Sequence, residues 1–334
     1  MATAKQLRAL LKSYGRRDDE QFYAVAMQLA AHEARLGHGK LARELRTLID
    51  DARSQRPAAT QQPPRPVPIA LPRGELAGLL SVSYPDVRLL DMVLPDELQR
   101  KLKRVLREQR QQSTLLSHGL PPRSKLLLLG PPGSGKTLTA RALAGELKLP
   151  LFTILLDGLI TKFMGETAAK LRLVFDAIRE TRGVYLFDEF DAIGGQRSLM
   201  NDVGEIRRVL NSFLHFLEEA EPTSLIVAAT NHPNLLDPAL FRRFDDVVEY
   251  SLPTAELAEE AFKSRLQGLK TKDLSWPTVV AAAEGLSYAE IGKACEDAAK
   301  EAILEATQTV TTESLVQALR DRKGATDRQE ELSA

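Results

Sequence analysis

The stretch that decides the fold is KLLLLGPPGSGKTLTARAL, residues 125–143. It joins an apolar run typical of a buried strand, a turn rich in glycine and proline, and a segment typical of a helix. The turn fits the spacing GxxxxGK[ST], in which backbone N–H groups and a helix N-terminus surround a chain of phosphates. The sequence therefore predicts a phosphate-binding loop, although a surface turn could fit the same spacing by chance.

Within this loop, glycines give the backbone room to approach a phosphate and permit positive φ angles. We expect the Lys136 ammonium to reach the terminal phosphates and the Thr137 hydroxyl to bind Mg²⁺. The predicted nucleotide contacts are Gly130, Pro131, Pro132, Gly133, Ser134, Gly135, Lys136, Thr137 and Leu138, together with Asp188.

The segment GVYLFDEFDAI, residues 183–193, is a second candidate for part of a catalytic site, because its apolar run ends at two adjacent carboxylates, Asp188 and Glu189. Asp188, at the carboxyl end of a strand beside the loop, is predicted to hold Mg²⁺ together with Thr137. Glu189 is predicted to orient and polarise an attacking water. Adjacent carboxylates are common on helix surfaces, but the preceding apolar strand and the phosphate loop favour these functions.

Two further segments contain polar residues that could take part in ATP hydrolysis. Asn231 follows the apolar run LIVAAT, on a strand expected to lie between the other two, and it could hydrogen-bond the γ-phosphate or the water; asparagine is also a common turn residue. Arg242 and Arg243 end the segment LDPALFRRF. An arginine from a neighbouring subunit could stabilise phosphoryl transfer, although such pairs more often form surface salt bridges.

Composition limits the function classes. Of the 334 residues, 43% are hydrophobic, and 45 basic residues balance 45 acidic ones, which argues weakly against a protein that coats nucleic acid. Cys295 is the single cysteine, so an intramolecular disulfide and a cysteine-based zinc site are excluded. No apolar run approaches the ~20 residues that span a bilayer, and the N-terminus is too polar for a signal peptide. We expect a soluble cytoplasmic protein without a membrane partner.

The hydrophobic pattern predicts five segments. Residues 1–53 form a small helical domain, which is either an interaction module or a solubilising cap. Residues 54–72 form a proline-rich linker. Apolar runs at 126–129, 151–155, 184–187, 225–229 and 247–250 alternate with helices and predict an α/β domain over 73–252 with a parallel five-stranded sheet. An all-helical domain follows over 253–322, with helices at 254–269, 277–284, 287–307 and 312–322, and then a disordered tail over 323–334.

The order of these motifs resembles the AAA ATPase family over about residues 85–320. GPPGSGKT is similar to its Walker A motif, LFDEFDAI to Walker B, AATN to its first sensor and LDPALFRRF to its second region of homology. The stretch 285–303 is similar to the family's lid signature. The resemblance implies a P-loop NTPase fold with a helical lid, and a hexameric ring with ATP and Mg²⁺ at subunit interfaces. Asn231 would be the sensor, and Arg242 and Arg243 would act in trans.

Residues 157–175 resemble the segment that carries the pore loop in katanin, spastin and related ring motors. The resemblance implies that Lys162, Phe163 and Met164 contact a polypeptide substrate in a central channel, with the aromatic ring as the grip. Without the resemblance, Phe163 is equally compatible with a core position. Residues 194–205 fall where a second pore loop would lie.

Some positions depart from the family pattern. Tyr288 replaces the usual lid glycine, and residues 91–93 match the adenine-contacting turn only loosely. The chain contains no HExxH after the ATPase domain, which excludes a fused zinc protease of the FtsH type. The segment 157–178 is also similar to bacterial ATPases paired with a separate subtilisin-like serine protease.

The sequence thus predicts a ring-forming AAA ATPase that remodels or unfolds proteins through a central pore, with partners bound by residues 1–53 and by the pore. Two alternatives stay open: an ATPase acting on nucleic acid, such as a loader or helicase-like motor, and a regulatory scaffold whose assembly is switched by ATP.

Overall fold

The computed structural model describes Thr47, Pro72 and residues 74–159, 164–194, 203–221, 223–271, 274–305 and 309–333. The chain divides into two units, Met1–Val67 and Pro68–Ala334, and the division falls within the predicted proline-rich linker. The helical domain predicted over residues 1–53 lies outside the described residues except for Thr47. All elements discussed below belong to the second unit.

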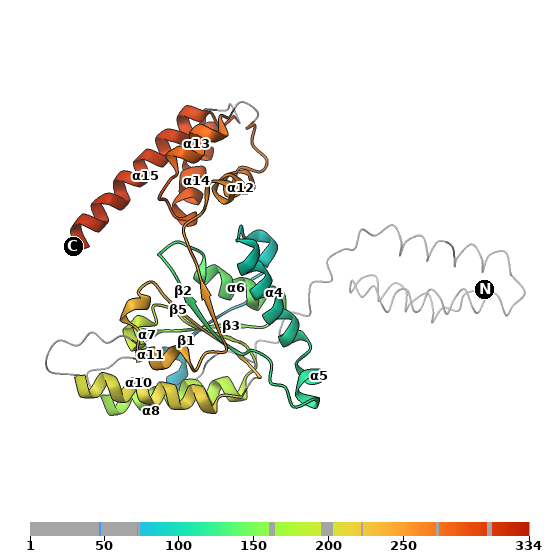
Figure 1. Ribbon diagram of the computed structural model, residues 1–334, viewed down its shortest axis with the longest axis vertical. Coiled ribbons are helices and arrows are strands. Elements are labelled where there is room, and N and C mark those ends of the chain that lie inside the picture. The colour runs from blue at the N-terminus through green and yellow to red at the C-terminus, as the bar shows by residue number, and fades with distance from the viewer. Residues whose placement is uncertain are drawn as a thin grey trace, which may run out of the picture. The chain divides into compact units, whose positions relative to one another are not determined.

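A six-stranded sheet forms the centre of this unit (Figure 1). Strand β1 is antiparallel to β3, whereas all other neighbouring strands are parallel. The predicted α/β class and the five predicted strands are therefore confirmed, and β1 is an additional edge strand that the sequence analysis did not include. In spatial order the strands are β1 (Leu80–Ser83), β3 (Leu151–Ile154), β4 (Val184–Phe187), β5 (Leu225–Thr230), β2 (Lys125–Leu129) and β6 (Asp246–Glu249).

Helices cover both faces of the sheet, which explains why its central strands are apolar throughout. Along β2, Leu127 and Leu129 pack into the core on one face, and Leu126 and Leu128 pack into the core on the other. Helices α8 (Met164–Glu180) and α10 (Val203–Glu219) cover the first face. Helices α4 (Asp96–Arg110) and α6 (Lys136–Leu147) cover the second face.

A separate helical domain follows the sheet and has its own core (Figure 1). Its α14 begins with a capping box, in which Ser287 and Glu290 satisfy each other's backbone N–H groups. Cys295 is buried in this core, and burial raises the pKa of its thiol to about 12. The four helices are α12 (Ala255–Arg265), α13 (Trp276–Ala282), α14 (Tyr288–Leu304) and α15 (Thr312–Ser333).

The C-terminal boundary differs from the prediction. Helix α15 does not end at Arg322 but continues to Ser333, so most of the segment predicted as a disordered tail is helical. The extension is polar and lacks an apolar stripe, so hydrophobic periodicity gives no signal for it.

Shorter elements complete the second unit. They are η2 (Gly74–Gly78), η3 (Leu89–Asp91), α5 (Gln112–Ser117), α7 (Leu156–Leu159), α9 (Asp191–Gly194), η4 (Pro233–Leu235) and α11 (Pro238–Phe241). Within the described part of the chain, no helix has the length and apolar character needed to cross a membrane.

Candidate functional site

The predicted phosphate loop lies between β2 and α6 and packs against two other parts of the unit. A Cβ added at Gly130 would lie 2.5 Å from the backbone oxygen of Tyr250, just after β6. A Cβ added at Gly133 would lie 2.4 Å from the Oγ of Ser287 in the helical domain. Both glycines have positive φ angles, of 147° and 72°. Close packing and backbone conformation therefore both require glycine at these two positions.

This packing gives a prediction about stability. We expect Gly130→Ala to lower the free energy of unfolding by at least about 2 kcal/mol, because the methyl group would meet backbone atoms that cannot move aside. Urea denaturation measures the change. Gly119→Ala is the matched control, since Gly119 has a φ of 73° but open space around it, and should cost about 1 kcal/mol. Equal losses for the two variants would contradict the proposed clash.

The side chain of Lys136 lies at the centre of the loop. Its Nζ donates to the carbonyl oxygens of Gly130 and Pro131, at 2.7 Å each. Burial lowers the pKa of this ammonium, and the nearby Asp188 carboxylate acts in the opposite direction. The cation is thus held where the loop's backbone curls, which is the position from which a lysine binds a phosphate chain.

The two predicted magnesium ligands are in direct contact. The Thr137 hydroxyl on α6 donates to Oδ2 of Asp188 at 2.7 Å, although the residues are 51 positions apart. Hydroxyl and carboxylate oxygens are hard ligands that suit Mg²⁺, which uses few protein groups and completes its shell with phosphates and water. Among the described residues there is no cluster of three or more acidic, histidine or cysteine side chains that could hold a metal without such help.

Glu189 has an unusual backbone conformation. Its φ angle is 50°, and its N–H donates to Oδ1 of Asp188 at 3.1 Å. The next residue, Phe190, is fully buried, and its N–H donates to the backbone oxygen of Ala229 at 2.8 Å. The end of β4 is thereby fixed to β5. This anchoring holds Glu189 in a left-handed conformation that is rare for residues with a side chain.

The neighbours of Asn231 are also held in place. Thr230 donates from its hydroxyl to Oδ1 of Asp191 at 2.7 Å, and the N–H of His232 donates to the same hydroxyl at 3.0 Å. These bonds connect the segment after β4 to the end of β5, which lies between β4 and β2 as predicted. Asp191 was not among the predicted site residues, because its partner Thr230 belongs to a different strand, β5.

The predicted residues from three segments line one cavity. Its volume of about 420 Å³ is typical of a small-ligand site. Arg141, Arg265, Tyr288 and Ala289 line it as well and were not among the predicted contacts. The lining residues from the predicted motifs are Pro132, Gly133, Gly135, Lys136, Thr137, Leu138, Asp188, Glu189 and Asn231.

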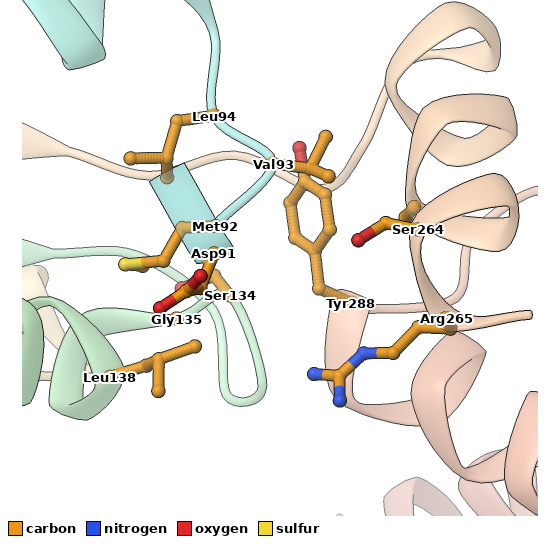
Figure 2. A pocket seen from close by; sticks show the side chains of 11 residues that line it. Asp91, Met92, Val93, Leu94, Ser134, Gly135, Leu138, Ser264, Arg265 and Tyr288 are labelled. Carbon is orange, nitrogen blue, oxygen red and sulfur yellow. The ribbon is translucent and has the colours of Figure 1, made fainter. Parts of the chain in front are cut away.

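A second pocket adjoins the loop on the side of residues 91–93 (Figure 2). Met92 and Leu138 supply apolar surface from the α/β domain, while Tyr288, Ser264 and Arg265 come from the helical domain. Burial raises the pKa of the Tyr288 phenol, which keeps the side chain neutral. Residues 91–93 and Tyr288 therefore lie together beside the phosphate loop.

Arg242 and Arg243 do not line either cavity of their own chain. Both follow α11, but their surroundings differ. Arg243 is half-buried, forms an ion pair with Glu218 at 2.7 Å, and donates from Nη1 to the backbone oxygen of Ala239 at 2.9 Å. Arg242 is exposed, and its side chain has no ion pair with the described residues.

Of the three predicted pore residues, only Met164 lies within the described residues. Lys162 and Phe163 lie outside the described residues, and Met164 begins α8. The segment predicted as a second pore loop lies outside them over 195–202. Their function as substrate contacts stays a prediction.

Comparison with known proteins shows which family the chain resembles. Residues 126–252 match the family described as "ATPase family associated with various cellular activities (AAA)". An uncharacterized AAA family ATPase, y4kL, of Sinorhizobium fredii is 37% identical over 322 residues, which are 96% of this chain and 96% of that protein.

Proteasome-activating nucleotidases are also similar. That of Sulfurisphaera tokodaii is 37% identical over 209 residues, covering 60% of this chain and 53% of the relative. That of Methanococcus vannielii is 34% identical over 220 residues, covering 64% and 54%. The chain thus spans about half the length of these nucleotidases.

Proposed function

This chain belongs to the AAA family of ATPases, and on that premise we propose which residues hydrolyse ATP and what the hydrolysis drives. The assignment of the ATP-hydrolysing residues rests mainly on the 2.7 Å hydrogen bond between Thr137 and Asp188. Both residues line the cavity that Lys136, Glu189 and Asn231 also line. The groups to which we assign phosphate binding, metal binding and orientation of water come from three segments and line one cavity, which supports the proposal.

The reaction is an in-line attack of water on the γ-phosphate, which forms one P–O bond and breaks the bond to the β-phosphate oxygen. Lys136 and the N–H groups of the loop bind the phosphates. Glu189 orients the water and accepts its hydrogen bond, and Asn231 contacts the water or the γ-phosphate. Thr137 and Asp188 would hold Mg²⁺, which would neutralise charge on the phosphates.

We propose that the chain acts as a ring, hexameric by resemblance, that remodels or unfolds proteins in the cytoplasm. Two observations support this: the sequence around Phe163 resembles the pore-loop segment of related ring motors, and two of the relatives are named proteasome-activating nucleotidases. Residues 1–53 would bind a partner or substrate.

The substrate class can be tested at Phe163. We expect Phe163→Ala to lower the unfolding of a tailed green fluorescent protein, measured per ATP hydrolysed, by about tenfold or more, because an apolar grip on the polypeptide is lost. Phe163→Tyr is the matched control and should retain most of the coupling, since it keeps an aromatic ring.

Two results would contradict this proposal. One is unchanged unfolding per ATP in Phe163→Ala. The other is stimulation of the ATPase by DNA but not by an unfolded protein, which would favour a motor that acts on nucleic acid. Slow turnover that no protein or nucleic acid accelerates would instead favour an ATP-switched scaffold.

A further inference from the structure

The backbone of Tyr250 contacts the phosphate loop at its first residue. Tyr250 follows β6 directly, and its N–H donates to the backbone oxygen of Leu129, the last residue of β2, at 2.7 Å. Its own backbone oxygen would lie 2.5 Å from a Cβ added at Gly130, so the two backbones are in close contact. The backbone of Tyr250 therefore fixes the point at which the chain leaves β2 and enters the loop.

The side chain of Tyr250 reaches the other end of the loop. Its phenol oxygen lies 2.6 Å from Oγ1 of Thr139, in the first turn of α6. Thr139 donates from that hydroxyl to the backbone oxygen of Gly135 at 3.1 Å. Because a threonine hydroxyl carries a single hydrogen, the phenol is the donor of the 2.6 Å bond. One residue is thus connected to both Gly130 and Gly135, the two ends of the loop.

The two hydroxyl groups are buried beside an apolar core. Thr139 is fully buried, and Tyr250 is 8% exposed and packs in the core that contains Leu128 and Leu143. Burial raises the pKa of the phenol far above its ordinary value, whereas the hydrogen bond with Thr139 acts in the opposite direction, so the phenol is a neutral donor. A buried hydrogen-bonded pair holds its partners at a fixed distance and direction, which an apolar pair of the same size would not do.

We propose that Tyr250, acting through Thr139, is a positioning residue that fixes the curvature of the phosphate loop before the nucleotide binds. This rests on the proposed ATP site and extends it to two buried side chains outside the lining of its cavity. Lys136 donates to the oxygens of Gly130 and Pro131, so a shift at the start of the loop would also displace the ammonium. A loop that already has its bound shape loses less conformational freedom when phosphates bind, which raises affinity.

Nucleotide affinity tests the proposal, measured on the full chain by displacement of a fluorescent ADP analogue. Tyr250→Phe should raise the Kd for ADP about fivefold, because the ring is kept and only the hydrogen bond is lost. Thr139→Val should raise the Kd at least as much, since it removes the bonds to both Tyr250 and Gly135. The double variant should bind no more weakly than Thr139→Val alone, because the two hydroxyl groups act as one unit.

Tyr185→Phe is the matched control for the loss of a buried hydroxyl. The phenol of Tyr185 donates to the backbone oxygens of Thr181 and Ala177, at 2.8 and 2.9 Å, and its ring packs in the core on the opposite face of the sheet. Urea denaturation should show a loss of stability in both tyrosine variants, whereas the Kd for ADP should rise only in Tyr250→Phe. Thr139→Ser keeps the hydroxyl and should bind ADP as the unaltered chain does.

Three results would overturn the assignment. These are an unchanged Kd for ADP in Tyr250→Phe, an equal rise in Tyr185→Phe, or equal values for Thr139→Val and Thr139→Ser. An equal rise in Tyr185→Phe would mean that affinity only follows the stability of the domain. If Tyr250→Phe does not fold, the two variants of Thr139 still give the third comparison. Failure of the unaltered chain to bind ADP would instead refute the proposed ATP site, so the two proposals fail in distinguishable ways.

Discussion

Replacing Glu189 by glutamine is expected to lower kcat for ATP hydrolysis by about 10²-fold or more while ATP still binds with near-normal affinity. The amide keeps the size of the side chain but can no longer polarise the water as a carboxylate does. Lys136 and the Thr137–Asp188 contact are untouched, so the groups that bind the phosphates remain. Phosphate release measures kcat, and displacement of a fluorescent nucleotide measures affinity.

The matched control for this variant is Glu301→Gln, the same chemical change at an exposed position on α14. Its activity should equal that of the unaltered chain. Two results would contradict the function given to Glu189: full hydrolysis in Glu189→Gln, or an equal loss of ATP binding and hydrolysis. An equal loss of binding and hydrolysis would mean that Glu189 helps to bind ATP, and no residue would then be assigned to orient the attacking water.

Much of the fold could be predicted because its strands are buried on both faces. Such strands appear in the sequence as short apolar runs, and β4 and β5 were predicted within one residue of their observed bounds. The run at the edge was missed because β1 has only the residues Leu80–Ser83, in which apolar and polar side chains alternate. Four alternating residues are too few to separate a strand from a loop.

The site was predictable only where its residues are contiguous in the sequence. The phosphate loop and the acidic pair each occupy one segment, so residue type and spacing were sufficient to select them as candidates, and they line one cavity. Arg265 ends a helix without any motif, and Asp191 accepts a hydrogen bond from Thr230, which is the last residue of a different strand. Such contacts arise when distant segments pack together, and no pattern within a single segment reports them.

Replacing Arg242 by alanine is expected to lower ATP hydrolysis about 10³-fold, the effect of losing an arginine that stabilises phosphoryl transfer. Arg242 is exposed and has no ion pair with the described residues, so it is available to a neighbouring subunit. Arg243 is held within its own chain by Glu218 and by the backbone of Ala239. We therefore expect Arg243→Ala to act mainly by lowering stability, with a smaller loss of kcat in the protein that remains folded.

Mixed assemblies test whether Arg242 acts in trans. Glu189→Gln subunits lack the water-orienting carboxylate but keep Arg242, whereas Arg242→Ala subunits have an intact carboxylate. If the arginine completes the site of its neighbour, mixing the two inactive variants should restore part of the activity, because some interfaces combine both functional groups. Mixing Glu189→Gln with the double variant Glu189→Gln/Arg242→Ala is the control and should restore none. Activity that stays absent in the first mixture, despite demonstrated subunit exchange, would mean that Arg242 acts within its own subunit or not on the phosphate at all.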